Sequence, residues 1–173
     1  MAGPNQTRSG PIALGGVMAA GSVALLWLAC AAPSGRTGLT AAAGLFPVAA
    51  TLYAGRTAGY LCWAAASLLG LFLLPDKAVA LLFAAFLGVY PVVKGRLETL
   101  ERRAVEWGVK LAWFEMTLTL FWFVFEDLFG APEWLGGNAL LLYGLGSVVF
   151  VIYDIGLSRL ITLLRARLSR VKG

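Results

Sequence analysis

The 173-residue chain contains no histidine, only two cysteines and few charged residues. Histidine is the commonest metal ligand and the usual general base near neutral pH, so its absence argues against a zinc site and most acid–base catalysis. Charged residues make up 13% of the chain, whereas a soluble domain of this size carries about 25%. The composition therefore disfavours both a metalloenzyme and a soluble globular domain.

Motifs of nucleotide-dependent and nucleophilic enzymes are also missing. The sequence has no Walker-type phosphate loop, no serine nucleophile elbow and no Cys-His pair. We therefore predict no catalytic residue, no metal, no cofactor and no nucleic-acid partner. Cys30 and Cys62 fall near opposite ends of their apolar runs, so we expect them to be unpaired, small buried residues.

Long apolar runs dominate the rest of the chain, of which 60% is hydrophobic. A helix that crosses a membrane needs about 20 apolar residues, and the runs Ile12–Ala32, Thr57–Leu74 and Ala78–Val93 carry no charge. This pattern predicts an all-α polytopic membrane protein, a bundle of six transmembrane helices forming a single integral membrane domain over residues 1–173. The expected helices are 12–32, 39–54, 57–74, 78–93, 107–128 and 139–157.

The first two expected helices have alternatives. Leu28–Ala32 around Cys30 resembles a cleavage site, but the preceding run exceeds the core of about 7–15 residues that signal peptides have, which favours a retained helix. The second helix is short and contains Pro47, so it is kinked or partly re-entrant. Such a proline is tolerated where neighbouring groups satisfy the carbonyl that it leaves without a donor.

One long polar stretch precedes the fifth helix. Within Lys94–Lys110, Glu98 and Arg102 have the i,i+4 spacing that supports a helix, as do Glu106 and Lys110. Its apolar residues share one stripe, which predicts an amphipathic helix over Lys94–Glu106 at the cytoplasmic surface. The stripe comprises Leu97, Leu100, Ala104, Trp107 and Leu111.

The positive-inside rule fixes the orientation. Six spans with a cytoplasmic amino terminus leave only Arg36 and Lys77 of the 14 Lys and Arg residues outside. Both termini are then cytoplasmic, and residues 158–173 form a basic cytoplasmic tail. The twelve inner cations are Arg8, Arg56, Lys94, Arg96, Arg102, Arg103, Lys110, Arg159, Arg165, Arg167, Arg170 and Lys172.

Gly16, Ala20 and Ala24 place small residues four apart in the first helix. Such residues let another helix approach closely. They serve either ordinary packing within the bundle or docking of a partner membrane protein, and the pattern alone does not choose.

Glu115 and Asp154 are carboxylates inside expected membrane helices, where such groups are paired or functional. Asp154 is expected to pair with Arg159, or with Lys110 across helices. Glu115 is expected to face the bundle interior near a cation, Lys94 or Lys110, or another polar group. We expect it to support the bundle rather than contact a ligand.

Aromatic, acidic and amide residues cluster at the outer ends of the last two helices. Aromatic residues there are commonly interfacial anchors. The alternative is a ligand site in which rings stack on a flat molecule and polar groups orient it. The candidate residues are Trp122, Glu126, Asp127, Trp134 and Asn138.

Several segments resemble a transporter family. They are the small-residue run Ala13–Ala20, the turn Ala32-Pro33, the pair Phe46-Pro47, the segment Gly88–Lys94, and Tyr153-Asp154 followed by Leu157–Ile161. With six helices in under 180 residues, the chain is similar to the substrate-binding S-components of energy-coupling factor (ECF) transporters, and to S-component-like membrane proteins of Gram-positive bacteria.

The resemblance implies a subunit of the bacterial cytoplasmic membrane that captures a vitamin or similar micronutrient from outside. Gly16, Ala20 and Ala24 would dock onto a transmembrane coupling protein, and separate ATPase subunits would energise release. Membrane lipid and a small-molecule ligand are the other expected partners. The alternatives are a structural or assembly protein with no ligand of its own and, with less support, an intramembrane enzyme.

Overall fold

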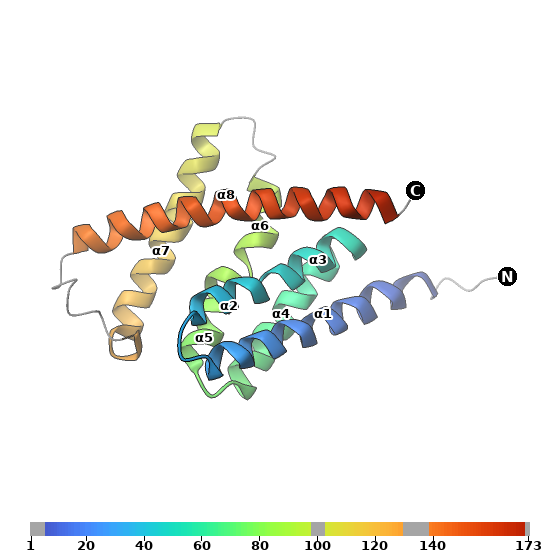
Figure 1. The fold of residues 1–173 in the computed structure, drawn as a ribbon, viewed down its shortest axis with the longest axis horizontal. Coiled ribbons are helices and arrows are strands. Elements are labelled where there is room, and N and C mark those ends of the chain that lie inside the picture. Colours follow the sequence, from blue (N-terminus) through green and yellow to red (C-terminus); the bar gives the residue numbers. More distant parts are fainter. Residues whose placement is uncertain (1–5, 98–102, 130–138, 172–173) are drawn as a thin grey trace. The chain divides into compact units, whose positions relative to one another are not determined.

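A computed structural model describes residues 6–97, 103–129 and 139–171, and every element within those ranges is a helix (Figure 1). The prediction of an all-α protein is confirmed. The chain divides into two compact units, residues 1–95 and 96–173. That the whole chain forms one membrane domain stays a prediction.

The first unit contains a long helix followed by shorter and interrupted ones. In chain order they are α1 (Gln6–Ala31), α2 (Arg36–Ala43), α3 (Leu45–Ala54), α4 (Arg56–Leu73), α5 (Lys77–Leu82), the π-helical segment η1 (Phe83–Leu87) and α6 (Tyr90–Leu97), whose last residues cross into the second unit. The second unit contains α7 (Arg103–Phe129) and α8 (Ala139–Val171).

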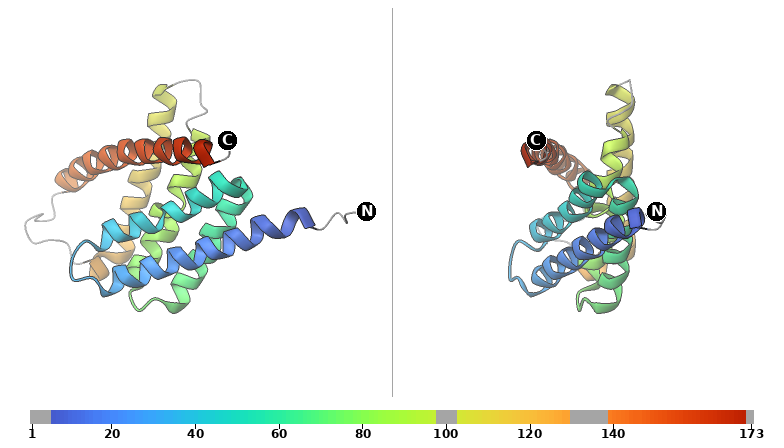
Figure 2. Two further views of the ribbon diagram at one scale, coloured as in Figure 1. Left: turned by 45° about the vertical axis from the view of Figure 1, so that its right-hand side comes forward. Right: turned by 90° about the vertical axis from the view of Figure 1, so that its right-hand side faces the viewer.

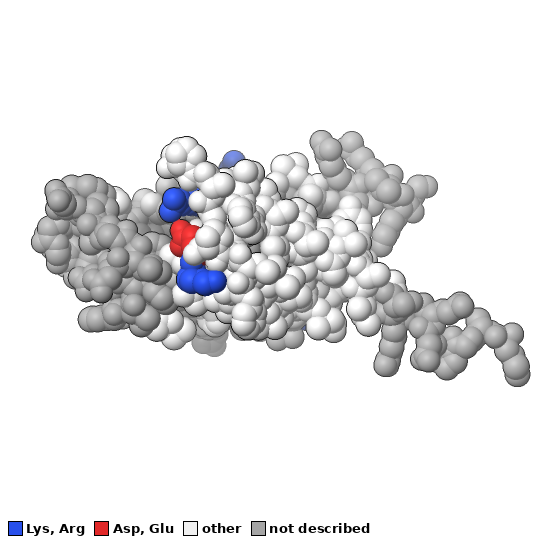
Figure 3. All heavy atoms as spheres, turned by 90° about the horizontal axis from the view of Figure 1, so that it is seen from below, with Lys and Arg blue, Asp and Glu red and all other residues white. Residues whose placement is uncertain are grey.

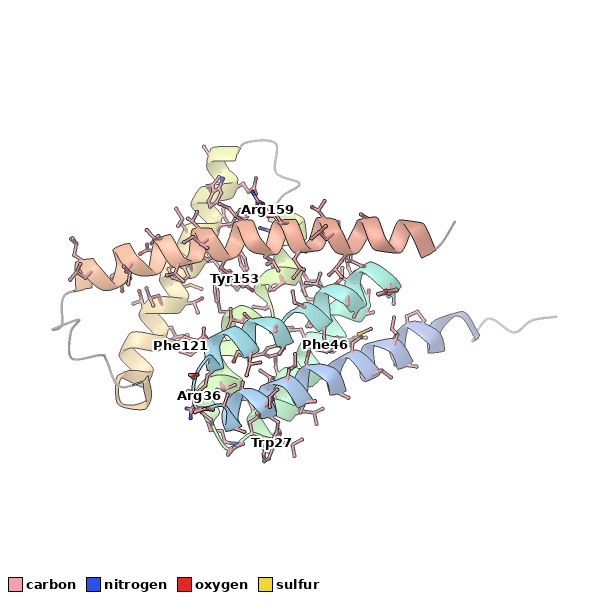
Figure 4. The ribbon with its side chains drawn as sticks, in the orientation of Figure 1. Trp27, Arg36, Phe46, Phe121, Tyr153 and Arg159 are labelled. Carbon is pink, nitrogen blue, oxygen red and sulfur yellow. The ribbon has the colours of Figure 1, made fainter. Side chains whose placement is uncertain are left out.

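Small residues let the helices of the first unit pack closely. The helices α1, α3 and α4 lie side by side in both views of Figure 2 and contact one another. Phe46 of α3 reaches α1 (Figure 4), where a Cβ on Gly21 would overlap its ring. Many of the residues that fill the shared core are alanines: Ala19, Ala29, Ala43, Ala50, Ala58 and Ala66, all at most 3% exposed.

The break between α2 and α3 falls at Gly44, three residues before Pro47. Pro47 lies in the first turn of α3, where a missing N–H breaks no bond within that helix. It nevertheless leaves the carbonyl of Ala43 without its i+4 donor. The Ser22 hydroxyl of α1 donates to that carbonyl at 3.0 Å, so a neighbouring helix satisfies it, as a membrane interior requires.

A second interruption lies in the expected helix 78–93, where η1 adopts π geometry. The Gly88 N–H donates to the Phe83 carbonyl at 2.7 Å, five residues back. Trp63 of α4 donates its indole N–H to the Ala84 carbonyl at 3.1 Å. A Cβ on Gly44 would overlap the carbonyl oxygen of Leu87, so the two interruptions meet.

Two loops of the first unit are joined by an ion pair. Asp76 caps the amino end of α5 by accepting hydrogen bonds from the backbone N–H groups of Ala78 and Val79 at 2.9 and 3.4 Å. Arg36, at the start of α2, donates to Asp76 at 3.2 Å. The loop after α1 and the loop after α4 therefore lie at the same end of this unit.

The surface of the described chain has the apolar character of a membrane protein. Phe72 is 82% exposed and Leu140 84%, and most of the described residues on the face that Figure 3 shows are uncharged. Five segments of the described chain are long and apolar enough to cross a membrane. They are Gly10–Ala31, Arg36–Ala54, Arg56–Leu73, Lys77–Gly95 and Tyr143–Leu164.

The described parts of the polar stretch and of the carboxyl-terminal region are helical. α6 continues to Leu97 and α7 begins at Arg103, while residues 98–102 of the expected amphipathic helix lie outside the described residues. α8 continues without a break to Val171, through most of the expected basic tail 158–173. Whether Lys94–Glu106 lies on a membrane surface stays a prediction.

Candidate ligand-binding site

An open hollow of about 500 Å³ lies between the two helices of the second unit. α7 contributes Glu115, and α8 contributes Leu140, Tyr143, Gly144 and Ser147. The α8 residues follow the i, i+3, i+4, i+7 spacing that places side chains on one helix face. Gly144 has open space around it, because a Cβ there would meet no atom within 4 Å.

A row of hydrogen bonds crosses between the helices at this hollow. The Ser147 hydroxyl donates to Glu115 Oε1 at 3.1 Å, and Thr119 Oγ1 lies 2.7 Å from the Tyr143 hydroxyl. Thr119 donates its single hydroxyl proton to the backbone carbonyl of Glu115 at 2.7 Å. The Tyr143 hydroxyl is therefore the donor toward Thr119, and this bond orients the tyrosine ring.

Glu115 is only partly buried, and its partner differs from the cations that we expected. Among the described residues, its carboxylate contacts Ser147, whereas Lys110 is engaged one to two turns away. The expectation of a nearby polar group is met by Ser147; the expectation of Lys110 as its partner is wrong. Lys110 binds two other carboxylates and therefore does not pair with Glu115.

Lys110 lies at the centre of a buried ionic cluster between α7 and α8. Its Nζ is 2.6 Å from Glu106 Oε1 and 3.3 Å from Asp154 Oδ2. The Lys110 and Asp154 side chains are each 3% exposed, and Nζ also lies 5.3 Å from the Trp107 ring centroid, within cation–π range. Of the two partners that the sequence offered for Asp154, the structure selects Lys110.

The five residues of the expected outer site lie where the structure describes no side chains, so that site stays a prediction. Trp122, Glu126 and Asp127 belong to α7, but their side chains lie outside the described residues, as do Trp134 and Asn138 entirely. The described hollow lies about two turns before Trp122 along α7. Sequence reasoning missed it, although Tyr143 and Ser147 share the helix face of Asp154.

The small residues of α1 divide between two faces. Gly15, Ala19 and Ser22 are buried against the first unit, and a Cβ on Gly15 would lie 3.5 Å from the Ala58 carbonyl oxygen. Gly16, Ala20 and Ala24 are exposed. Packing within the first unit is therefore carried by the neighbouring face, and Gly16, Ala20 and Ala24 remain available for another partner.

Fold, surface and hollow together define an all-helical membrane protein with a partly polar hollow between two helices. No protein-family model, curated protein or solved structure matches the chain. A function must therefore be inferred from the chemistry of the site.

Proposed function

We propose that the chain is the solute-binding membrane subunit of a micronutrient uptake transporter, and that the hollow between α7 and α8 holds the solute. The hollow carries the proposal because its volume, about 500 Å³, falls in the range of about 300–1,000 Å³ typical of ligand pockets. Its wall combines the apolar Leu140 with the polar groups of Glu115, Tyr143 and Ser147. Ligand sites have this mixture, in which apolar walls provide affinity and a few polar groups provide orientation.

The proposal includes six membrane spans. α7 has 27 residues, about 40 Å at 1.5 Å per residue, enough for a hydrocarbon core of about 30 Å. α7 and the five apolar segments already described make six spans. When the amino terminus is cytoplasmic, an even number of spans returns the carboxyl terminus to the cytoplasmic side. The Arg36–Asp76 ion pair supports this order, because alternating spans put the loops after α1 and α4 on one side.

The exposed small residues of α1 supply the expected contact with a coupling protein. Gly16, Ala20 and Ala24 leave a shallow face on which another membrane helix can pack closely. The sequence provides no nucleotide-binding motif, so energy would come from separate ATPase subunits. The vitamin-like nature of the solute and the bacterial cytoplasmic membrane rest on the family resemblance.

The proposal is tested by extracting small molecules from the purified full-length protein. We expect one compound to be recovered in near-stoichiometric amount from the wild type and to be lost in Gly144→Leu, which fills the hollow. Gly156→Leu is the matched control because it makes the same substitution on the same helix. A Cβ at position 156, as at 144, would meet no atom within 4 Å, so both variants should fold.

Three results separate the proposal from its alternative. A compound lost only in Gly144→Leu supports a solute-binding subunit. A compound retained equally in both variants places the solute outside the hollow. Absence of any enriched compound, from cells grown in rich medium, favours the structural or assembly protein.

A further inference from the structure

We propose that the ligand of the α7–α8 hollow is a small organic cation. This inference rests on the proposed function, adds the chemical class of the solute, and gives Glu115 a ligand contact in place of the supporting role expected from the sequence. It follows from an imbalance of charge at the hollow, which has a carboxylate, Glu115, and among the described residues of its wall no positive group.

The position of Glu115 makes that imbalance expensive. Glu115 follows Lys110 by five residues, about 7.5 Å along the helix axis, and lies beside Phe114 and Met116 in the apolar part of α7. A carboxylate at such depth must pair with a cation, bind a proton or reach water. The Ser147 hydrogen bond occupies one of about four acceptor positions of the carboxylate, so the others are available to a ligand.

Lys110, the nearest described cation of α7, is already engaged by other carboxylates. It is held by Glu106 and Asp154 at 2.6 and 3.3 Å, so two carboxylates share its ammonium group. The hollow therefore presents its carboxylate to a positive group that comes from outside the chain.

The remaining wall also suits an organic cation. The Tyr143 ring is held in place through its hydroxyl, which bonds to Thr119 at 2.7 Å, and an aromatic ring attracts a cation over its face. Leu140 adds an apolar surface, and Gly144 leaves the space between them open. A ligand with a positive nitrogen and a flat or apolar body satisfies each of these groups at once.

The test compares three probes that share a phenyl ring and differ in charge, on the full-length protein in lipid nanodiscs. Benzyltrimethylammonium keeps its charge at every pH, benzyl alcohol is neutral, and benzoate is an anion. Binding is measured by ligand-detected NMR with empty nanodiscs as background. We expect the cation to bind wild type at least tenfold more tightly than the other two probes.

Two variants locate the effect. Glu115→Gln removes the charge but keeps an oxygen that accepts the Ser147 bond, and it should weaken the cation at least tenfold. Asp76→Asn is the control because it removes a carboxylate in the first unit while asparagine still caps α5; it should leave binding unchanged. Gly144→Leu should abolish binding of the cation.

Other outcomes overturn the inference without ambiguity. Equal binding of benzyl alcohol or benzoate, or unchanged cation binding in Glu115→Gln, shows that the carboxylate does not select the ligand. If binding is still lost in Gly144→Leu, the proposed solute site survives that failure. If no probe binds, the cation inference is rejected, and the extraction experiment decides the proposed function separately.

Discussion

Replacing Lys110 by methionine tests how the two helices of the second unit are held together. Methionine keeps an unbranched apolar side chain of comparable length but removes the charge that binds Glu106 and Asp154. Asp154 is then left 3% exposed without its lysine. Breaking a buried ion pair from one side costs about 3–5 kcal/mol, because the remaining charge loses that partner and gains no solvation in exchange.

The companion variants have smaller expected effects. In Asp154→Asn, Lys110 keeps Glu106 at 2.6 Å, so the loss is that of a hydrogen bond to a charged group, about 1.5–3 kcal/mol. In the double variant Lys110→Met/Asp154→Leu both charges disappear together. Replacing a buried pair by apolar residues is often close to neutral, but Glu106 still loses Lys110, so the double variant should recover only part of the stability that Lys110→Met loses.

The free energy of unfolding is measured by SDS titration of the purified protein, with tryptophan fluorescence as the signal. The reasoning predicts that Lys110→Met is the least stable of the three variants. It is refuted if Lys110→Met loses less than about 1 kcal/mol, the value of an exposed pair. It is also refuted if the double variant is as unstable as the single one.

Three further predictions concern the first unit. Gly44→Ala should destabilise the protein, since a Cβ would overlap a backbone carbonyl of η1, while Gly38→Ala, in open space on α2, should not; thermal unfolding distinguishes them. Asp76→Ala should lose about 1 kcal/mol through the helix cap of α5, and equal stability of Asp76→Ala and wild type would contradict the cap. Cys30, which is partly exposed, should react with a small maleimide in the folded protein, whereas the fully buried Cys62 should react only after unfolding; equal rates would contradict the packing of α4.

The helical class and most helix positions were predictable because long uncharged runs leave few alternatives to membrane helices. The exact positions at which the helices are interrupted were not predictable. Pro47 indicated a break, but its place at Gly44 depends on the approach of Leu87, which lies 43 residues further along the chain. The π geometry at Phe83–Leu87 likewise depends on that contact and on Trp63, and no local pattern reveals either.

At the candidate site, too, the sequence indicated the unusual residues but not their partners. Glu115 and Asp154 stood out in the sequence because carboxylates are rare inside apolar helices. Their partners could not be assigned, since Lys110 was a candidate for both and the choice depends on how α7 and α8 face each other. The ligand site was expected at Trp122, whereas the described hollow is built from Tyr143, whose alignment with Glu115 requires the pairing of two helices.

Protection of the hollow by its own ligand tests the central claim most directly. In a Cys30→Ser/Cys62→Ala background, Gly144→Cys and Gly156→Cys are alkylated by a small maleimide, with and without the compound extracted from the wild-type protein. At a ligand concentration of about ten times Kd roughly nine sites in ten are occupied. The rate at Gly144→Cys should then fall about tenfold, while Gly156→Cys is unchanged. Equal rates with and without the compound at both positions would contradict a solute site between α7 and α8.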